Sequence, residues 1–374
     1  PCSSRPGSRR QGPQDVQEPG QRHRYPWQIA EKYGADALRF NLVTGNSPGN
    51  DMRFYTERCE AMRNFANKIW NASRFLMMNL TIDKCELPEK LELEDKWILS
   101  KLNRAIGEIT ENMDKYELGV AAQKIYDFIW DDYCDWYIEL TKTRLQGDDE
   151  DSKVRAQQVL CYVLTDMLKL LHPFMPFITE EIWQALPHEG DFLMLSQWPQ
   201  VSDSRNFPEE EKAMELIMDA IRAVRTRRSE MNVPPSKKAH LTVATQEQAV
   251  FEAGIPFLKR LASASEVEVV PAAEARQEAG QVVIATHVAQ ISIPLGELVD
   301  LEQGEGPGPE GAGQESQDAL RSGGQAPESR LCEQGPRQRG GGRAGAGRKA
   351  ARPDREAGGT APEHVRKENK SRRG

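Results

Sequence analysis

The sequence predicts a mainly α-helical protein, an antiparallel helical bundle followed by a small α+β module, with disordered segments at both ends. Through residues 52–200, apolar side chains recur at three- and four-residue steps, the period of an amphipathic helix. In residues 209–303, a helix is followed by short apolar runs of strand length. Residues 1–28 and 304–374 are aperiodic and rich in Gly, Pro, Arg and Gln, so they cannot bury enough apolar surface to fold.

Residues 29–51 precede the predicted bundle and are treated as a separate segment. They contain a short helix and the start of a strand over 29–42, and then a turn-rich loop over 44–51. The turn at 46–49 has the sequence Asn-Ser-Pro-Gly and can present backbone N–H groups to a phosphate, although a turn alone is a weak signal.

Four long helices form the predicted bundle. Those over 62–80 and 118–145 each carry an apolar stripe, and the one over 154–171 is rich in Leu and Val. The last of them ends at His172, because a residue before proline avoids the helical region. A short helix over 179–186 follows, with Thr179 as its candidate N-cap. The long helices are expected over 62–80, from 93 to beyond 109, over 118–145 and over 154–171, with an acidic turn at 147–151.

The α+β module begins after a polar, proline-containing linker near 201–208. Its first element is a helix from Glu209 to about Met231. Four short strands with a helix near 257–262 between the first two complete it. The strands are expected at 239–244, 267–270, 282–285 and 289–293.

Charge and cysteine usage exclude several classes of protein. The formal net charge is −8, with +3 on residues 1–28 and +4 on residues 304–374, so the body at 29–303 carries −15. No run of about 18 apolar residues predicts a membrane helix. The 6 Cys are scattered without a CxxC spacing, which argues against a zinc ribbon or a disulfide scaffold and favours a reducing, cytoplasmic location. No catalytic motif occurs, and the 6 His are too dispersed for a metal site.

A polar stripe on the first long helix is the first candidate binding site. Arg and Asn side chains on one helix face can contact phosphates and base edges, while Lys acts as a point charge. A solvated helix face has the same composition, so both interpretations stay open. The stripe consists of Arg63, Asn67, Asn71 and Arg74, with Asn64 and Lys68 beside them.

A second cationic cluster lies at the start of the α+β module. Six cations in a short stretch are unusual in a body of charge −15, which favours phosphate contact. By contrast, the aromatic run at 130–137 has helical spacing, which predicts core positions, and its interleaved Asp residues would repel phosphate. The cluster consists of Arg222, Arg225, Arg227 and Arg228, with Lys237 and Lys238 after a Val-Pro-Pro turn.

Four segments together resemble the valyl-tRNA synthetase family, in order and in spacing. They are EKYGADALRFNLVTGNSPGNDMRF at 31–54, RNFANKIWNASRF at 63–75, HPFMPFITEEIW at 172–183 and MNVPPSKK at 231–238. The resemblance covers residues 29 to about 303. It implies the end of a class I catalytic core at 29–51, a helical anticodon-binding domain at 52–200 and the start of the C-terminal region at 209–303.

The family resemblance also implies a function. Its members join valine to tRNA(Val) with ATP and Mg, and the nucleotide-binding half and the editing domain precede the part that matches here. This chain is therefore expected to hold no cofactor, to bind tRNA(Val) as a monomer, to bind neither DNA nor membranes, and to be inactive as an enzyme alone. The helix at 63–75 is expected to lie against the tRNA, with Phe75 available to stack on a base.

Both flanks also fit the family when they are read one base out of register. Residues 13–24 can be encoded so that the shifted frame gives Arg-Lys-Met-Ser-Lys-Ser-Leu-Gly-Asn-Gly-Ile, which resembles the family's ATP-closing loop. Residues 328–336 can be encoded so that the shifted frame resembles the C-terminal coiled-coil arm. We therefore expect residues 1–28 and 304–374 to be out-of-frame segments, which the nucleotide sequence would test.

Two other interpretations remain open. The acidic body is also typical of a non-catalytic helical interaction module without an RNA role, which the second cationic cluster opposes. The third possibility is a fragment of an isoleucyl- or leucyl-type synthetase, which tRNA preference would reveal.

Overall fold

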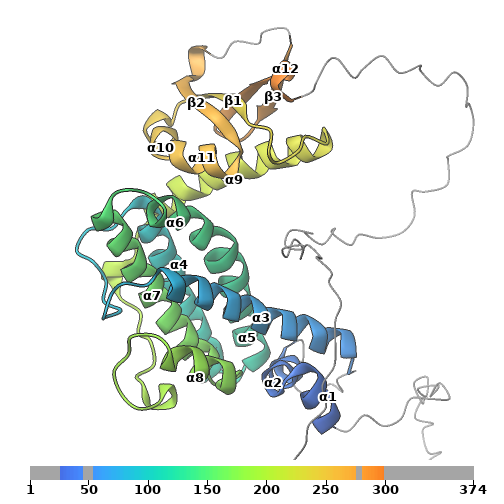
Figure 1. Cartoon of the computed structure of the whole chain (residues 1–374), viewed down its shortest axis with the longest axis vertical. Helices are drawn as coiled ribbons and strands as arrows, with labels where there is room; N and C mark the ends of the chain where they lie inside the picture. Colours follow the sequence, from blue (N-terminus) through green and yellow to red (C-terminus); the bar gives the residue numbers. More distant parts are fainter. Residues whose placement is uncertain (1–25, 45–53, 275–279, 299–374) are drawn as a thin grey trace, which may run out of the picture. The chain divides into compact units, whose positions relative to one another are not determined.

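The computed structural model describes residues 26–44, 54–274 and 280–298 (Figure 1). It begins with two short helices, α1 (Pro26–Tyr33) and α2 (Ala35–Val43). Gly34 separates them with a φ of 95°, a conformation that glycine adopts without steric cost. The expected strand start is wrong, because Phe40 and Asn41 are buried on α2. A short apolar run of this kind does not distinguish strand from helix.

The predicted bundle is confirmed as a mainly helical assembly around a common core. Most of the apolar side chains that predicted these helices are buried, while Met62, Leu80 and Trp136 are half-buried. The described helices carry no stretch long and apolar enough to cross a membrane. The elements are α3 (Thr56–Asn79), α4 (Leu93–Asp114), α5 (Leu118–Asp127), η1 (Phe128–Tyr137), α6 (Ile138–Leu145), α7 (Glu150–Leu171) and α8 (Pro176–Gln184).

The segment expected as one α-helix over 118–145 contains a π-helical stretch, η1. Its wider turn places Tyr133 and Tyr137 in the core, as the aromatic spacing predicted, while Trp130 and Trp136 are half-buried at its edges. Wide turns of this type frequently occur at functional sites. Sequence periodicity does not reveal η1, because the same apolar stripe fits either helix type over a few turns.

The start of α8 is also different from the prediction. Thr179 is not the N-cap, because α8 begins earlier, at Pro176, and the Thr179 hydroxyl donates to the Met175 carbonyl instead. The Asp36 carboxylate, on α2, accepts the backbone N–H groups of Phe177 at 3.3 Å and of Ile178 at 2.7 Å. A residue 141 positions earlier therefore caps this helix, and local sequence rules do not detect such a cap.

The α+β module contains the predicted four strands, but two helices, not one, lie between the first two of them. Its helix α9 (Pro208–Glu230) is followed by a four-stranded sheet of order β2-β1-β4-β3. The central strand β1 pairs in parallel with β2 and antiparallel with β4, where Val243 lies opposite Ile291. The remaining elements are β1 (Ala239–Thr245), α10 (Gln248–Ala253), α11 (Ile255–Leu261), β2 (Ala264–Pro271), β3 (Gln281–Ala285), β4 (Ala289–Pro294) and α12 (Leu295–Leu298).

Buried side chains continue from the bundle through α9 into the sheet as one hydrophobic cluster. Within this cluster Cys85 and Cys161 form a disulfide. A single disulfide is not the disulfide scaffold that the cysteine spacing argues against. The first flank is also shorter than expected, because α1 already begins at Pro26. The other expectations for residues 1–25, for the turn at 46–49 and for residues 304–374 lie outside the described residues.

Candidate functional site

The polar stripe lies on the solvent side of α3, and we call it the α3 face (Arg63, Asn64, Asn67, Asn71 and Arg74). All of its members except the half-buried Arg63 are exposed. Among the described residues Arg74 makes no ion pair, so its guanidinium keeps its donors for a ligand. Arg63 lies 3.2 Å from the Glu60 carboxylate and stacks over the Tyr33 ring at 5.6 Å.

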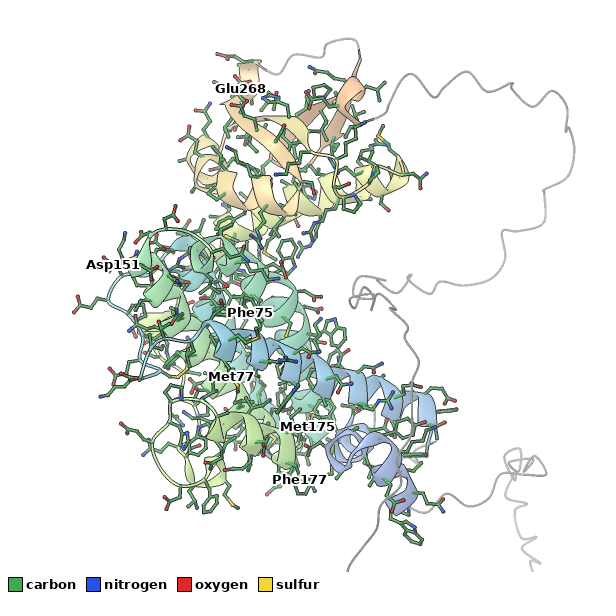
Figure 2. All side chains as sticks on the ribbon, viewed as in Figure 1. Phe75, Met77, Asp151, Met175, Phe177 and Glu268 are labelled. Atoms are coloured by element: carbon green, nitrogen blue, oxygen red, sulfur yellow. A yellow bond between two sulfur atoms is a disulfide. The ribbon has the colours of Figure 1, made fainter. Side chains whose placement is uncertain are left out.

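Lys68 and Phe75 lie beside the α3 face but are engaged with the next helices. The Lys68 ammonium is 2.7 Å from the Asp135 carboxylate and 3.5 Å from the centroid of the Trp130 ring. Phe75 is half-buried against the core, with the Lys142 ammonium 5.5 Å from its ring (Figure 2). Phe75 therefore offers at most part of its ring to a base.

The π-helical stretch η1 joins the two predicted cationic features. On one side, Trp130 lies under Lys68 of α3. On the other, Trp136 lies under two cations of α9, with Arg222 at 4.9 Å and Arg225 at 5.8 Å from the ring centroid. Cations over indole rings gain electrostatic attraction from the ring. Lys68 and Arg222 are more than 150 positions apart in sequence, and both are brought against η1, a juxtaposition that the sequence alone did not indicate.

Three of the α9 arginines are exposed. Arg222 pairs with Asp219 at 2.7 Å and Arg227 with Glu230 at 3.2 Å. Exposed pairs of this kind are weak, so a phosphate can compete for the guanidinium. Arg225 is partly committed, because its Nε donates to the Leu261 carbonyl at 2.7 Å.

Arg228 has a different position from the one expected for a phosphate contact. It is only 5 % exposed, and its guanidinium donates to the backbone carbonyls of Pro234 and Lys237. It therefore holds the turn between α9 and β1, and its charge does not face solvent. Lys237 and Lys238 follow this turn, and Lys238 is exposed.

Acidic residues of η1 divide the surface. Burial raises the pKa of Asp132 to about 6, and burial together with neighbouring carboxylates also raises the pKa of Asp131. Asp135 neutralises Lys68 by direct contact. Anion binding is therefore favoured at the α3 face and along α9, on either side of η1.

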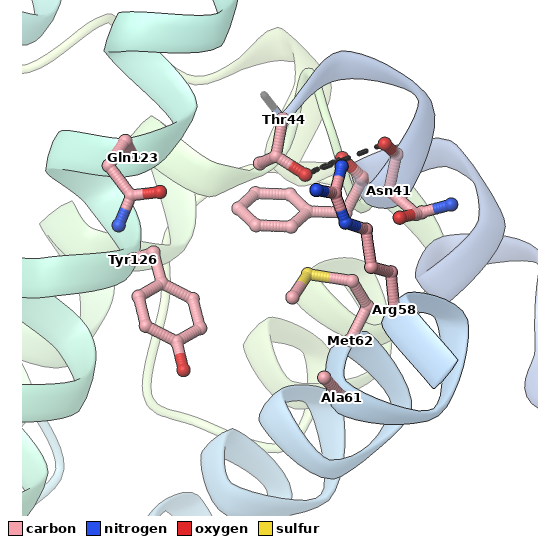
Figure 3. Close-up of a pocket in the computed structure, with 8 residues that line it drawn as sticks. Asn41, Thr44, Arg58, Ala61, Met62, Gln123 and Tyr126 are labelled. Atoms are coloured by element: carbon pink, nitrogen blue, oxygen red, sulfur yellow. Dashed lines mark hydrogen bonds between the residues drawn. The ribbon is translucent and has the colours of Figure 1, made fainter. Parts of the chain in front are cut away.

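A pocket of about 240 Å³ opens where α2, α3 and α5 meet (Figure 3). Phe40 and Met62 give it an apolar lining, while Arg58 and Gln123 add polar groups. The Tyr126 ring, which also lines the pocket, stacks on Trp130 with centroids 5.6 Å apart, so the pocket adjoins η1. The pocket therefore combines an apolar lining with a few hydrogen-bonding groups. Sequence reasoning missed these residues because only tertiary packing assembles them.

The chain resembles known proteins over most of its described length. Residues 95–244 match the model of the family "Anticodon-binding domain of tRNA ligase". The valine–tRNA ligases of Clostridium tetani and Clostridium perfringens are each 50% identical over 282 and 283 residues, and that of Bacillus cereus is 43% identical over 284 residues. Each alignment covers 74% of this chain and 32% of the relative, so the chain spans about one third of the length of these relatives.

Proposed function

This chain is a relative of the valine–tRNA ligases that carries an anticodon-binding domain, and we propose that its function is to bind transfer RNA. The observation that carries the proposal is the surface on either side of η1, where the α3 face and the exposed arginines of α9 lie. Arg74 and the neighbouring Asn side chains would contact phosphates and base edges, because they have unused donors. The half-buried Phe75 would contribute only the exposed part of its ring.

On α9 and just after the turn that follows it, we propose that Arg222, Arg227 and Lys238 contact the RNA backbone. Arg225 supports Arg222 at the Trp136 ring, and Arg228 with Lys237 holds the turn from which Lys238 projects. Lys68 remains a weaker candidate, because the Asp135 carboxylate already neutralises it.

Charge reversal at Arg74 tests the α3 face. For the Arg74→Glu variant of the full chain, we expect tRNA affinity to fall by roughly 10-fold or more. The slope of log K against log salt is expected to fall by about one. Fluorescence anisotropy titrations at several salt concentrations measure both quantities.

Lys115→Glu provides the matched control, because Lys115 is an exposed cation at the end of α4 that pairs with Glu111. Its substitution should leave the affinity within about twofold of the parent chain. Equal losses for Arg74→Glu and Lys115→Glu would mean only non-specific attraction between RNA and protein. No tRNA binding by the parent chain at low salt would support the alternative of a helical interaction module.

We also propose that the preferred partner is tRNA(Val), because the relatives reported above are all valine–tRNA ligases. Competition between tRNA(Val), tRNA(Ile) and tRNA(Leu) transcripts measures this preference. Stronger competition by tRNA(Ile) or tRNA(Leu) would instead favour the isoleucyl- or leucyl-type assignment.

The catalytic activity of the relatives is proposed only for a whole ligase. There it attaches valine to tRNA with ATP and Mg, in the cytoplasm, and we propose that this chain acts as a monomer without a cofactor of its own. Formation of valyl-tRNA by the purified chain alone would contradict this division of roles.

A further inference from the structure

The disulfide between Cys85 and Cys161 joins two parts of the bundle that local structure does not connect. Its Cα atoms are 5.2 Å apart, within the usual range for disulfides, and 76 positions separate the residues in sequence. Cys161 is fully buried on α7, whereas Cys85 is half-buried on the connector at 80–92, which links α3 to α4. One cysteine is thus sheltered, and the other is partly exposed to solvent.

The connector contains no helix or strand, and several of its contacts are made to α7. The backbone N–H and hydroxyl of Thr81 both donate to the Gln157 side chain, at 2.8 and 3.0 Å. At its other end, the Glu92 carboxylate lies 3.5 Å from Arg155. Cys161 is one helical turn beyond Gln157 on α7. The disulfide adds a covalent attachment of the described connector to α7 beside these polar contacts.

We propose that Cys85 and Cys161 form a reversible oxidation site that locks the connector onto α7. The cysteine usage favours a reducing compartment, and disulfides in such compartments are usually transient or redox-sensing. A pair with one partly exposed and one buried cysteine fits this role, because the more exposed thiol would react first and the buried thiol would resolve the intermediate.

The oxidant class is a small-molecule disulfide such as oxidised glutathione. The Cys85 thiol loses its proton, and its sulfur attacks one glutathione sulfur, which breaks the glutathione S–S bond and releases one reduced glutathione. The Cys161 sulfur, after losing its proton, attacks the Cys85 sulfur and displaces the second reduced glutathione. Two protein thiols are oxidised, one glutathione disulfide is reduced, and both protons end on glutathione thiols.

The test compares the full chain after treatment with dithiothreitol and after treatment with oxidised glutathione. After oxidation, mass spectrometry should find the peptides of Cys85 and Cys161 joined, and alkylation should no longer label either residue. Closing so long a loop should raise Tm by roughly 5–15 °C. Trypsin cleavage after Lys84 and Lys90, whose side chains are 71% and 72% exposed, should become several-fold slower.

Two variants separate this site from other thiol chemistry. Cys85→Ser should abolish the Tm gain on oxidation, whereas Cys134→Ser, at a half-buried free cysteine on η1, should retain it. Labelling of both Cys85 and Cys161 after oxidation would overturn the proposal, as would an equal Tm gain in Cys85→Ser. Neither readout involves tRNA, so the result is independent of the proposed function.

Discussion

Two regions of the bundle use the same kinds of side chain for opposite purposes. In the buried junction (Glu94, Asp95, Tyr137 and Arg144), one guanidinium satisfies two carboxylates, at 2.9 and 2.7 Å. On the α3 face, Arg74 is exposed and makes no ion pair among the described residues. An arginine whose N–H donors are hydrogen-bonded within the protein stabilises this fold. An arginine whose donors are free is available for a ligand.

The buried junction is nearly complete as a hydrogen-bonded network. Tyr137 donates to Asp95 at 2.8 Å, and Arg144 also donates to the Ser152 hydroxyl at 3.0 Å. Burial and the adjacent Asp95 raise the pKa of Glu94, while Arg144 opposes that shift. The junction ties α4, α6 and α7 together, so it fixes the helices on which the proposed binding surface is built.

The sharpest test of this comparison is to remove an arginine from each region. Arg144→Met leaves two buried carboxylates without a cation, so we expect it to lower the free energy of unfolding by roughly 3–5 kcal/mol. Arg74→Met should change it by less than about 0.5 kcal/mol, because surface substitutions usually have little effect. Urea titrations followed by circular dichroism measure both values.

The binding assay should give the reverse order. At a temperature where both variants are folded, Arg74→Met should weaken tRNA binding more than Arg144→Met does. If Arg144→Met were no less stable than the parent chain, the junction would not support the fold as its contacts indicate. The contrast between the hydrogen-bonded Arg144 and the free Arg74 would then not hold.

Elements that depend on local periodicity were predictable from the sequence. The apolar stripes predicted α3 and the helical run over 118–145, and the His-Pro pair predicted the end of α7 near His172. The N-terminal cap of α8 was not predictable, because Asp36 reaches it from α2. Local patterns report on helices, whereas contacts between distant residues require the packed structure.

The candidate site was predictable only in part, for the same reason. Counting charges selected Arg228, although it follows the buried Val224 by four positions and therefore shares its inward face. This spacing was a usable signal that charge counting ignored. Trp136 gave no such signal, because its place under Arg222 depends on how α9 packs against η1.

A weaker test concerns Asp132, a half-buried carboxyl group on η1. Burial raises its pKa from 3.8 to about 6, so the folded protein retains a proton that the unfolded chain has lost between these pH values. Stability should therefore fall as pH rises from 3.8 to about 6. Asp132→Asn should remove on the order of 1–2 kcal/mol of that dependence. Urea unfolding at pH 4.5 and pH 7 measures the difference, and an unchanged dependence in Asp132→Asn would place its origin in other groups.

The smallest expected effect comes from releasing a paired cation, Lys68, from its ion pair with Asp135. Asp135→Asn removes the carboxylate that lies 2.7 Å from the Lys68 ammonium, while Lys68 keeps its place over the Trp130 ring. Because the ion pair is largely exposed on the Asp135 side, stability should fall by less than about 1 kcal/mol. Affinity for tRNA should rise by roughly two- to threefold, since one negative charge is lost and one cation is released beside the α3 face. Asp127→Asn, at the last residue of α5, changes the charge equally without releasing Lys68. An equal gain in both variants would show that only net charge matters. A gain confined to Asp135→Asn would show that the ion pair with Asp135 had kept the Lys68 ammonium from binding RNA.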